Sequence, residues 1–178
     1  VYLSDLFASQ KPSQVARSRR LEKRWLPIVV NTAESGGIVL RQRTWVAPLS
    51  RIENSWETVG KAKSLGVAEF TLENSTNQPR EVSFRLGIGL SLEQGEHRPV
   101  EMHNAGKHVL WTQGDRLLAA LDVADIQPSS PRAREASPEG ALRVAAGASG
   151  IVLTGRLSPA STRRVVACIP AWQAKRAE

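Results

Sequence analysis

The segment Glu81–Leu92 reads EVSFRLGIGLSL, and its pattern decides the fold class. Every second residue is apolar, beginning with Val82 and Phe84, and the residues between them are polar or small. A period of two places alternate side chains on opposite faces of a strand, whereas a helix needs apolar residues three or four positions apart. We therefore predict a strand with one buried face, extending roughly 40 Å and belonging to a large sheet.

Neighbouring segments predict further strands. Val67–Glu73 alternates in the same way, and the turn-forming run Asn74–Pro79 predicts a hairpin with the strand that follows. The remaining candidates are short apolar or alternating segments bounded by Gly, Pro and Ser: Ile38–Val46, His108–Thr112, Arg116–Val123, Ala141–Ala146, Ile151–Leu157 and Thr162–Ile169. About eight strands separated by turns favour two packed layers. The sequence predicts an all-β fold, a two-layer antiparallel β-sandwich over residues 36–178.

Residues 1–35 are predicted to be a lead-in to this domain. Within them, the charged stretch Gln14–Trp25 is compatible with a helix or with an exposed extended segment. Gln127–Glu139 is rich in Pro, Ser and Arg, and predicts a long excursion between strands. The chain begins at Val1 and not at a methionine, so we expect it to be one part of a longer protein.

The composition is that of an ordinary globular domain, with 41% hydrophobic and 23% charged residues. No apolar run approaches the roughly 20 residues that span a bilayer, so no membrane partner is expected. The single cysteine, Cys168, excludes an internal disulfide and lies in an apolar run, which favours a buried structural thiol. It leaves the compartment undecided, and secreted and periplasmic locations are both compatible with it.

The net charge of +7 raises the question of a nucleic-acid partner. The basic residues gather in Arg17–Arg24 and scatter again over Arg132–Arg164, but no nucleic-acid-binding motif accompanies either set. We therefore expect no nucleic-acid partner, and a basic surface that is solvated or faces another domain.

A search for catalytic motifs finds no phosphate-binding glycine loop, nucleophile elbow or paired-cysteine metal motif, so no catalytic residue and no cofactor is predicted. The stretch with most chemistry holds His97, His103 and His108, together with Glu96 and Glu101. Imidazole and carboxylate groups can bind zinc or act as acid and base, but neither gap matches a helical ligand pair. We interpret the stretch as an exposed hairpin loop without a metal. Ligand contact through His97 and His103 and a metal site are the alternatives.

The tryptophan content gives a second set of candidates, because five of the nine aromatic residues Phe, Tyr and Trp are Trp. An indole ring can stack on a sugar, and it fills a sandwich core equally well. Trp56 lies in a polar stretch and is the best candidate for an exposed platform. Trp45 shares a strand face with Arg43, so both are candidate ligand-binding residues, whereas Trp111 is expected in the core.

Three stretches carry a family resemblance: Gly37–Val46, Val67–Asn74 leading into Glu81–Leu90, and Ile151–Pro170, in which Leu157-Ser158-Pro159 separates two strands. They resemble the accessory β-sandwich domains that precede or follow the catalytic helical barrel in bacterial six-hairpin glycosidases and related carbohydrate-active enzymes. Similar strand–turn–strand patterns are also common in immunoglobulin-like modules. The resemblance implies a domain without catalytic carboxylates, because those residues usually lie in the barrel.

The function expected from these observations is that of a non-catalytic domain that packs against a neighbouring catalytic domain of the same carbohydrate-processing enzyme. The small outward residues Ser83, Gly87, Gly89 and Ser91 predict a flat face that another domain approaches closely. Two alternatives stay open: a free-standing carbohydrate-binding module that takes an oligosaccharide as partner, and a small metal-dependent hydrolase that uses the loop from His97 to His108.

Overall fold

The computed structural model describes residues 2–4, 15–24, 27–49, 63–87, 101–105, 108–122, 126–128, 142–147, 150–172 and 174. These residues form strands and one 3-10 turn, η2, at Glu22–Arg24. The strands are β1 Tyr2–Ser4, β2 Ala16–Leu21, β3 Val29–Ser35, β4 Ile38–Pro48, β5 Ser64–Asn74, β6 Arg80–Gly87, β7 Glu101–Ala105, β8 His108–Gln113, β9 Arg116–Asp122, β10 Ile126–Pro128, β11 Leu142–Gly147, β12 Gly150–Leu157 and β13 Thr162–Pro170. Within this part of the chain, no helix has the length and apolar character needed to cross a membrane.

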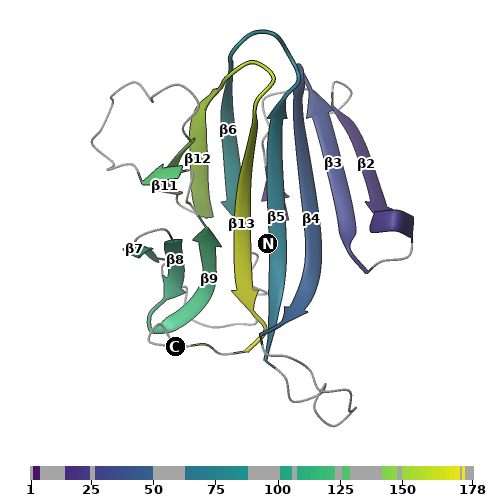
Figure 1. Ribbon diagram of the computed structural model, residues 1–178. Helices are drawn as coiled ribbons and strands as arrows, with labels where there is room; N and C mark the ends of the chain where they lie inside the picture. Colours follow the sequence, from purple (N-terminus) through teal and green to yellow (C-terminus); the bar gives the residue numbers. More distant parts are fainter. Residues whose placement is uncertain are drawn as a thin grey trace.

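The strands form two sheets, and the predicted all-β sandwich is confirmed (Figure 1). The large sheet has eight strands in the order β2-β3-β4-β5-β13-β9-β8-β7, and each neighbouring pair is antiparallel. The smaller sheet has five strands in the order β1-β6-β12-β11-β10, with one parallel pair, β10 and β11. In the view of Figure 1 the large sheet is in front, with β6 and β12 behind it.

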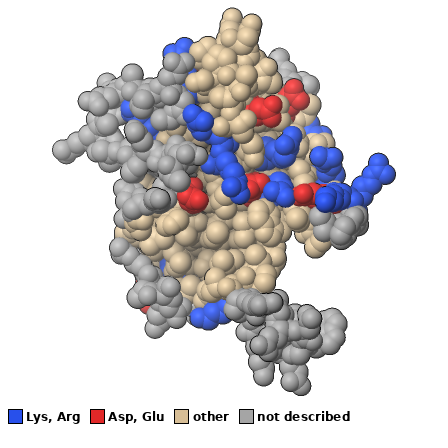
Figure 2. All heavy atoms as spheres, in the orientation of Figure 1, with Lys and Arg blue, Asp and Glu red and all other residues tan. Residues whose placement is uncertain are grey.

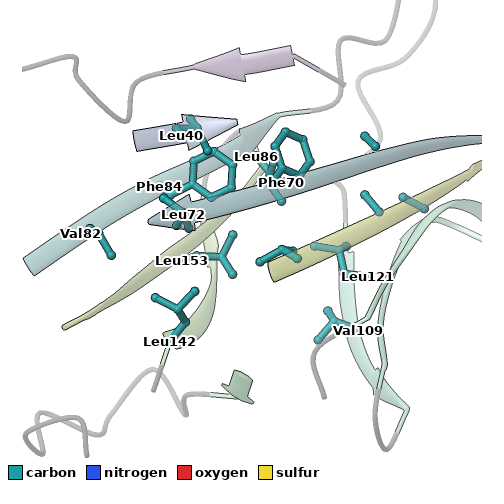
Figure 3. Close-up of a cluster of buried hydrophobic side chains, with 14 of the residues drawn as sticks. Leu40, Phe70, Leu72, Val82, Phe84, Leu86, Val109, Leu121, Leu142 and Leu153 are labelled. Carbon is teal, nitrogen blue, oxygen red and sulfur yellow. The ribbon is translucent and has the colours of Figure 1, made fainter. Parts of the chain in front are cut away.

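The core lies between the sheets and follows the predicted alternation. Val82, Phe84 and Leu86 of β6 are buried, while Glu81 and Ser83 are exposed. Phe84 meets Phe70 of β5 with ring centroids 5.3 Å apart and ring planes at 59°, a tilted contact favoured by the ring quadrupoles (Figure 3). The strand therefore has the predicted register over the residues described, and residues 88–92 lie outside them.

The predicted hairpin between β5 and β6 is wrong. β5 pairs with β4 and β13 in the large sheet, whereas β6 pairs with β1 and β12 in the smaller one. The turn after Asn74 is therefore a corner that carries the chain from one layer to the other. Both strands bury one face in the same core, and local alternation cannot distinguish this arrangement from a paired hairpin.

Several strands occur where none was predicted. Of the two conformations allowed for Gln14–Trp25, residues 16–21 are extended and form β2, which pairs with β3 at one edge of the large sheet. All six residues of β2 are exposed, so it lacks the alternation that would reveal a strand. Ile126–Pro128 forms β10 at the start of the segment expected to be an excursion. Residues 129–141 lie outside the described residues.

Candidate interaction face of the large sheet

The register of the large sheet places two kinds of row on its outward face. One row joins Arg43, Glu69, Val166 and Asp122 across β4, β5, β13 and β9. Two residues away along each strand, on the same face, a second row of side chains from β4 to β8 carries no charge. A third, shorter row without charge lies next to it on β4, β5 and β13. We call these residues the apolar face: Trp45, Val67, Cys168, Ala120 and Leu110 in one row, with Ala47, Leu65 and Pro170 in the next.

Figure 2 shows this arrangement from outside. Basic and acidic side chains gather in a band across the middle of the front face, and an area without charge lies below the band. In Figure 1 the lower ends of β4, β5 and β13 occupy that area. A charged band and an uncharged area therefore lie side by side on one sheet.

The charged band is an ion-pair network centred on Glu69. Arg43 donates from Nη1 to Glu69 Oε1 at 2.8 Å, and from Nε and Nη2 to Glu22 Oε2 at 2.9 and 2.7 Å. Arg164 donates from Nε to the other oxygen of Glu69 at 2.6 Å, and its Nη2 is in contact with the same oxygen. Both oxygens of Glu69 are thus occupied, although only 9% of this side chain is exposed.

The network shifts the pKa values of Glu69 and Arg43. Burial alone raises the pKa of Glu69, but the hydrogen bonds and positive charges of Arg43 and Arg164 outweigh it and lower the pKa below the ordinary carboxyl value. Hydrogen bonds to Glu69 and Glu22 raise the pKa of Arg43. Glu69 is therefore ionised near neutral pH and cannot serve as a general acid there.

Trp45 lies at the boundary between the charged band and the apolar face. The Arg43 guanidinium carbon is 5.4 Å from the centroid of its ring, a cation–π contact that covers one face of the indole. The next residue in the row, Val67, is only 8% exposed although it points outward. This contact agrees with the prediction that Trp45 and Arg43 share a strand face. Because Arg43 covers one side of the indole ring, a sugar could stack only on the other side.

Cys168 is the residue for which the predicted environment is wrong. It is half-buried and faces outward between Val67 and Ala120, whereas its neighbour Ala167 is 3% exposed and fills the core position. Partial burial raises the pKa of the Cys168 thiol, and the negative charge of Asp122 raises it further. The thiol is therefore protonated near pH 7 and is a poor nucleophile.

The histidine stretch is not a loop over the residues that the structure describes. Glu101–Ala105 forms β7 and pairs with β8. Met102 packs against the core, and the alternate residues Glu101 and His103 point away from it. His103 Nε2 lies 3.0 Å from Thr112 Oγ1 and 3.3 Å from Glu101 Oε2. His97 lies outside the described residues, within which no group of three or more His, Cys, Asp and Glu side chains could hold a metal ion.

The candidate residues do not converge on one site. His103 pairs with Leu110, so it lies at the far end of the row that begins with Trp45. Five strand spacings separate the two residues, or roughly 24 Å. Trp56 lies outside the described residues, and Trp111 is in the core at 3% exposure, as predicted.

The flat face predicted on the smaller sheet is only partly described. Ser83 is exposed there, opposite the exposed Thr154 of β12, and Gly89 and Ser91 lie outside the described residues. Sequence reasoning missed the apolar face of the large sheet. Its members come from five strands, and no local pattern shows which of them share a row.

Comparison with known proteins finds no relative of this chain. No protein-family model matches the chain, and no curated protein or solved structure matches it.

Proposed function

We propose that the chain is a non-catalytic β-sandwich domain of a carbohydrate-processing enzyme, and that its apolar face packs against the catalytic domain of the same protein. The apolar face is the observation that carries this proposal. An antiparallel sheet with one face toward water normally presents polar side chains there. Here the outward rows from Trp45 to Leu110 and from Ala47 to Pro170 hold no charged residue.

The size and surroundings of the apolar face suit contact with another domain. Five neighbouring strands extend across roughly 20 Å, the scale of one side of a contact that buries about 600–1,500 Å² in total. The network of Arg43, Glu69 and Arg164 lies along one side of it. An apolar centre beside a polar rim is the usual organisation of a protein interface.

The pairing of acids with arginines in the charged band supports a non-catalytic role. Glu22 and Glu69 are both hydrogen-bonded to arginine, and the pKa of Glu69 is lowered. Glycoside hydrolysis commonly needs one protonated and one ionised carboxyl group on either side of the bond that is cleaved. The assignment to carbohydrate processing rests on the resemblance of Gly37–Val46 and Ile151–Pro170 to accessory domains of glycosidases.

Association with the rest of the full-length protein tests the proposal. The isolated chain is titrated with the remaining domains, using isothermal titration calorimetry, and the Cys168→Lys variant is expected to weaken binding at least tenfold. Thr162→Lys is the matched control, because Thr162 is exposed on the same strand and face but at the charged end. Thermal unfolding of both variants checks that the fold is retained.

Two results would overturn the proposal. The first is equal association of the Cys168→Lys and Thr162→Lys variants with the remaining domains. The second is turnover of chromogenic glycosides by the isolated chain. Micromolar binding of an oligosaccharide that is lost in Trp45→Ala would favour the carbohydrate-binding module instead.

A further inference from the structure

The edge of the large sheet formed by β2 is open to solvent. β2 pairs with β3 on one side, and it has no second partner strand among the described residues. All six of its residues, Ala16–Leu21, are exposed, and none of the described residues covers this edge. An uncovered edge strand presents backbone N–H and C=O groups that can pair with another extended chain.

The same edge carries unneutralised positive charge. Arg17, Arg19 and Arg20 lie on β2, and Lys23 and Arg24 follow in η2. None of the five takes part in an ion pair or side-chain hydrogen bond within the described residues. The nearby acid of η2, Glu22, is held by Arg43. The edge therefore attracts anionic groups at three of the six positions of the strand and at the turn that follows it.

A hollow lies at the end of this strand. It has a volume of about 640 Å³, and the described residues that line it are Arg20, Leu21, Lys23 and Arg24. Leu21 is 44% exposed, so the hollow offers one apolar side chain among cations. It is continuous with the open edge, because Arg20 and Leu21 belong to both.

The backbone at the hollow has an uncommon conformation. Lys23 and Arg24 have φ angles of 48° and 68°, in the left-handed region that residues with a side chain rarely adopt. Glu22 holds the turn in place, because its N–H donates to the Ile28 carbonyl at 2.9 Å and its carboxylate accepts from Arg43. Consecutive residues held in this region often mark functional sites.

We propose that the β2 edge and its hollow bind an acidic polypeptide segment in the extended conformation, as an added strand of the large sheet. Main-chain hydrogen bonds to β2 supply part of the affinity, as in other cases of strand addition. Side chains alternate along β2, so Arg17 and Arg19 face one side and Arg20 the other. The segment that fits best therefore carries Asp or Glu at alternate positions, with an apolar side chain near Leu21.

This occupant accounts for both features of the edge. A compact anion such as phosphate could use the cations, but it would leave the backbone groups of β2 unused. A second copy of the chain would bring its own basic β2 against this one, and the like charges would repel. The inference goes beyond the proposed function, because β2 contributes no residue to the apolar face.

Binding of a designed peptide to the isolated chain tests the proposal. The probe is a fluorescent ten-residue peptide that alternates Glu with Val or Thr, and its affinity is measured by anisotropy. We expect micromolar binding that weakens at least tenfold in the double variant Arg17→Gln/Arg19→Gln. The matched control is Arg41→Gln, which removes an exposed cation from β4 but leaves the edge intact. The same peptide with N-methyl groups on alternate amides should also bind at least tenfold more weakly, since it cannot form the hydrogen-bond ladder.

The outcomes separate strand addition from simple charge attraction. Equal binding of the parent and N-methylated peptides, or displacement of the peptide by millimolar inorganic phosphate, would assign the edge to small anions and overturn the proposal. Equal binding by the double variant and Arg41→Gln, or no binding of the peptide by the native chain, would overturn it as well. None of these outcomes bears on the association of the apolar face with another domain.

Discussion

Replacement of Asn74 by alanine should loosen the join between the two sheets. Asn74 ends β5 at the corner where the chain crosses between layers, and its side chain is fully buried. Its Nδ2 donates to the carbonyl oxygens of Gln78, Leu157 and Ser158 at 2.8, 3.2 and 3.1 Å. Its Oδ1 accepts from the N–H and hydroxyl of Thr76 at 3.0 and 2.7 Å. One side chain thus ties the β5–β6 corner to the end of β12.

The expected loss follows from these contacts. A typical hydrogen bond contributes about 0.5–1.5 kcal/mol net, and a buried group left without a partner costs about 1–3 kcal/mol. Leu157 is fully buried, so water cannot readily replace the amide at its carbonyl, whereas the exposed Gln78 can be resolvated. We expect Asn74→Ala to lower the free energy of unfolding by about 2–4 kcal/mol, or roughly 5–15 °C in Tm for a domain of this size.

Urea denaturation followed by circular dichroism measures the loss, with Asn77→Ala as the matched control. Asn77 lies in the same turn but is exposed, so its replacement should change stability by no more than about 0.5 kcal/mol. Asn74→Asp adds a test of the donor, because an ionised carboxylate cannot donate to the three carbonyls. The loss of unfolding free energy in Asn74→Asp should be smaller at low pH, where the protonated acid regains one donor. Equal midpoints for Asn74→Ala and Asn77→Ala would refute the role of Asn74 in joining the sheets.

Two further predictions concern the core and the charged band. Phe84→Ala should lower the free energy of unfolding by about 3–5 kcal/mol, because Phe84 is fully buried against Phe70. Thr154→Ala, on the outward face, should change it little. Similar losses for the two variants would contradict the assigned register. Because the folded pKa of Glu69 lies below the ordinary value of 4.5, its contribution to stability is complete above that pH and is lost as the pH falls through the folded pKa. Glu69→Gln should therefore be less stable than the native chain at pH 7, and chemical denaturation at several pH values measures this difference in unfolding free energy. A difference that stays constant down to pH 2 would show that the network does not stabilise the fold.

Local patterning in the sequence was sufficient for the fold class. The alternation around Phe84 placed β6 correctly in the core, and the same period of two put Arg43 and Trp45 on one face. The alternation could not show which strands pair with one another, and the predicted pairing of β5 with β6 was wrong. Asn74 resembled an ordinary turn former, and only the structure shows that it joins two layers.

The candidate site was less predictable than the fold. The apolar face depends on the order β4-β5-β13-β9-β8, which brings Trp45 and Leu110 into one row although they lie far apart in the chain. Cys168 was expected to be buried because its neighbours are apolar, but alternate residues of β13 face opposite sides of the sheet, and Cys168 lies on the outward side. β2 gave no strand signal, since all its side chains are exposed.

The labelling rate of Cys168 tests the central claim most directly. It is the single cysteine of the chain and lies within the apolar face, so its thiol reports contact there. The isolated chain is treated with a maleimide at pH 8.5, with and without a saturating amount of the remaining domains of the full-length protein, and modification of this chain is followed by mass spectrometry. We predict at least tenfold slower labelling when those domains are present. An unchanged rate under conditions where association is demonstrated would place the contact elsewhere and contradict the account.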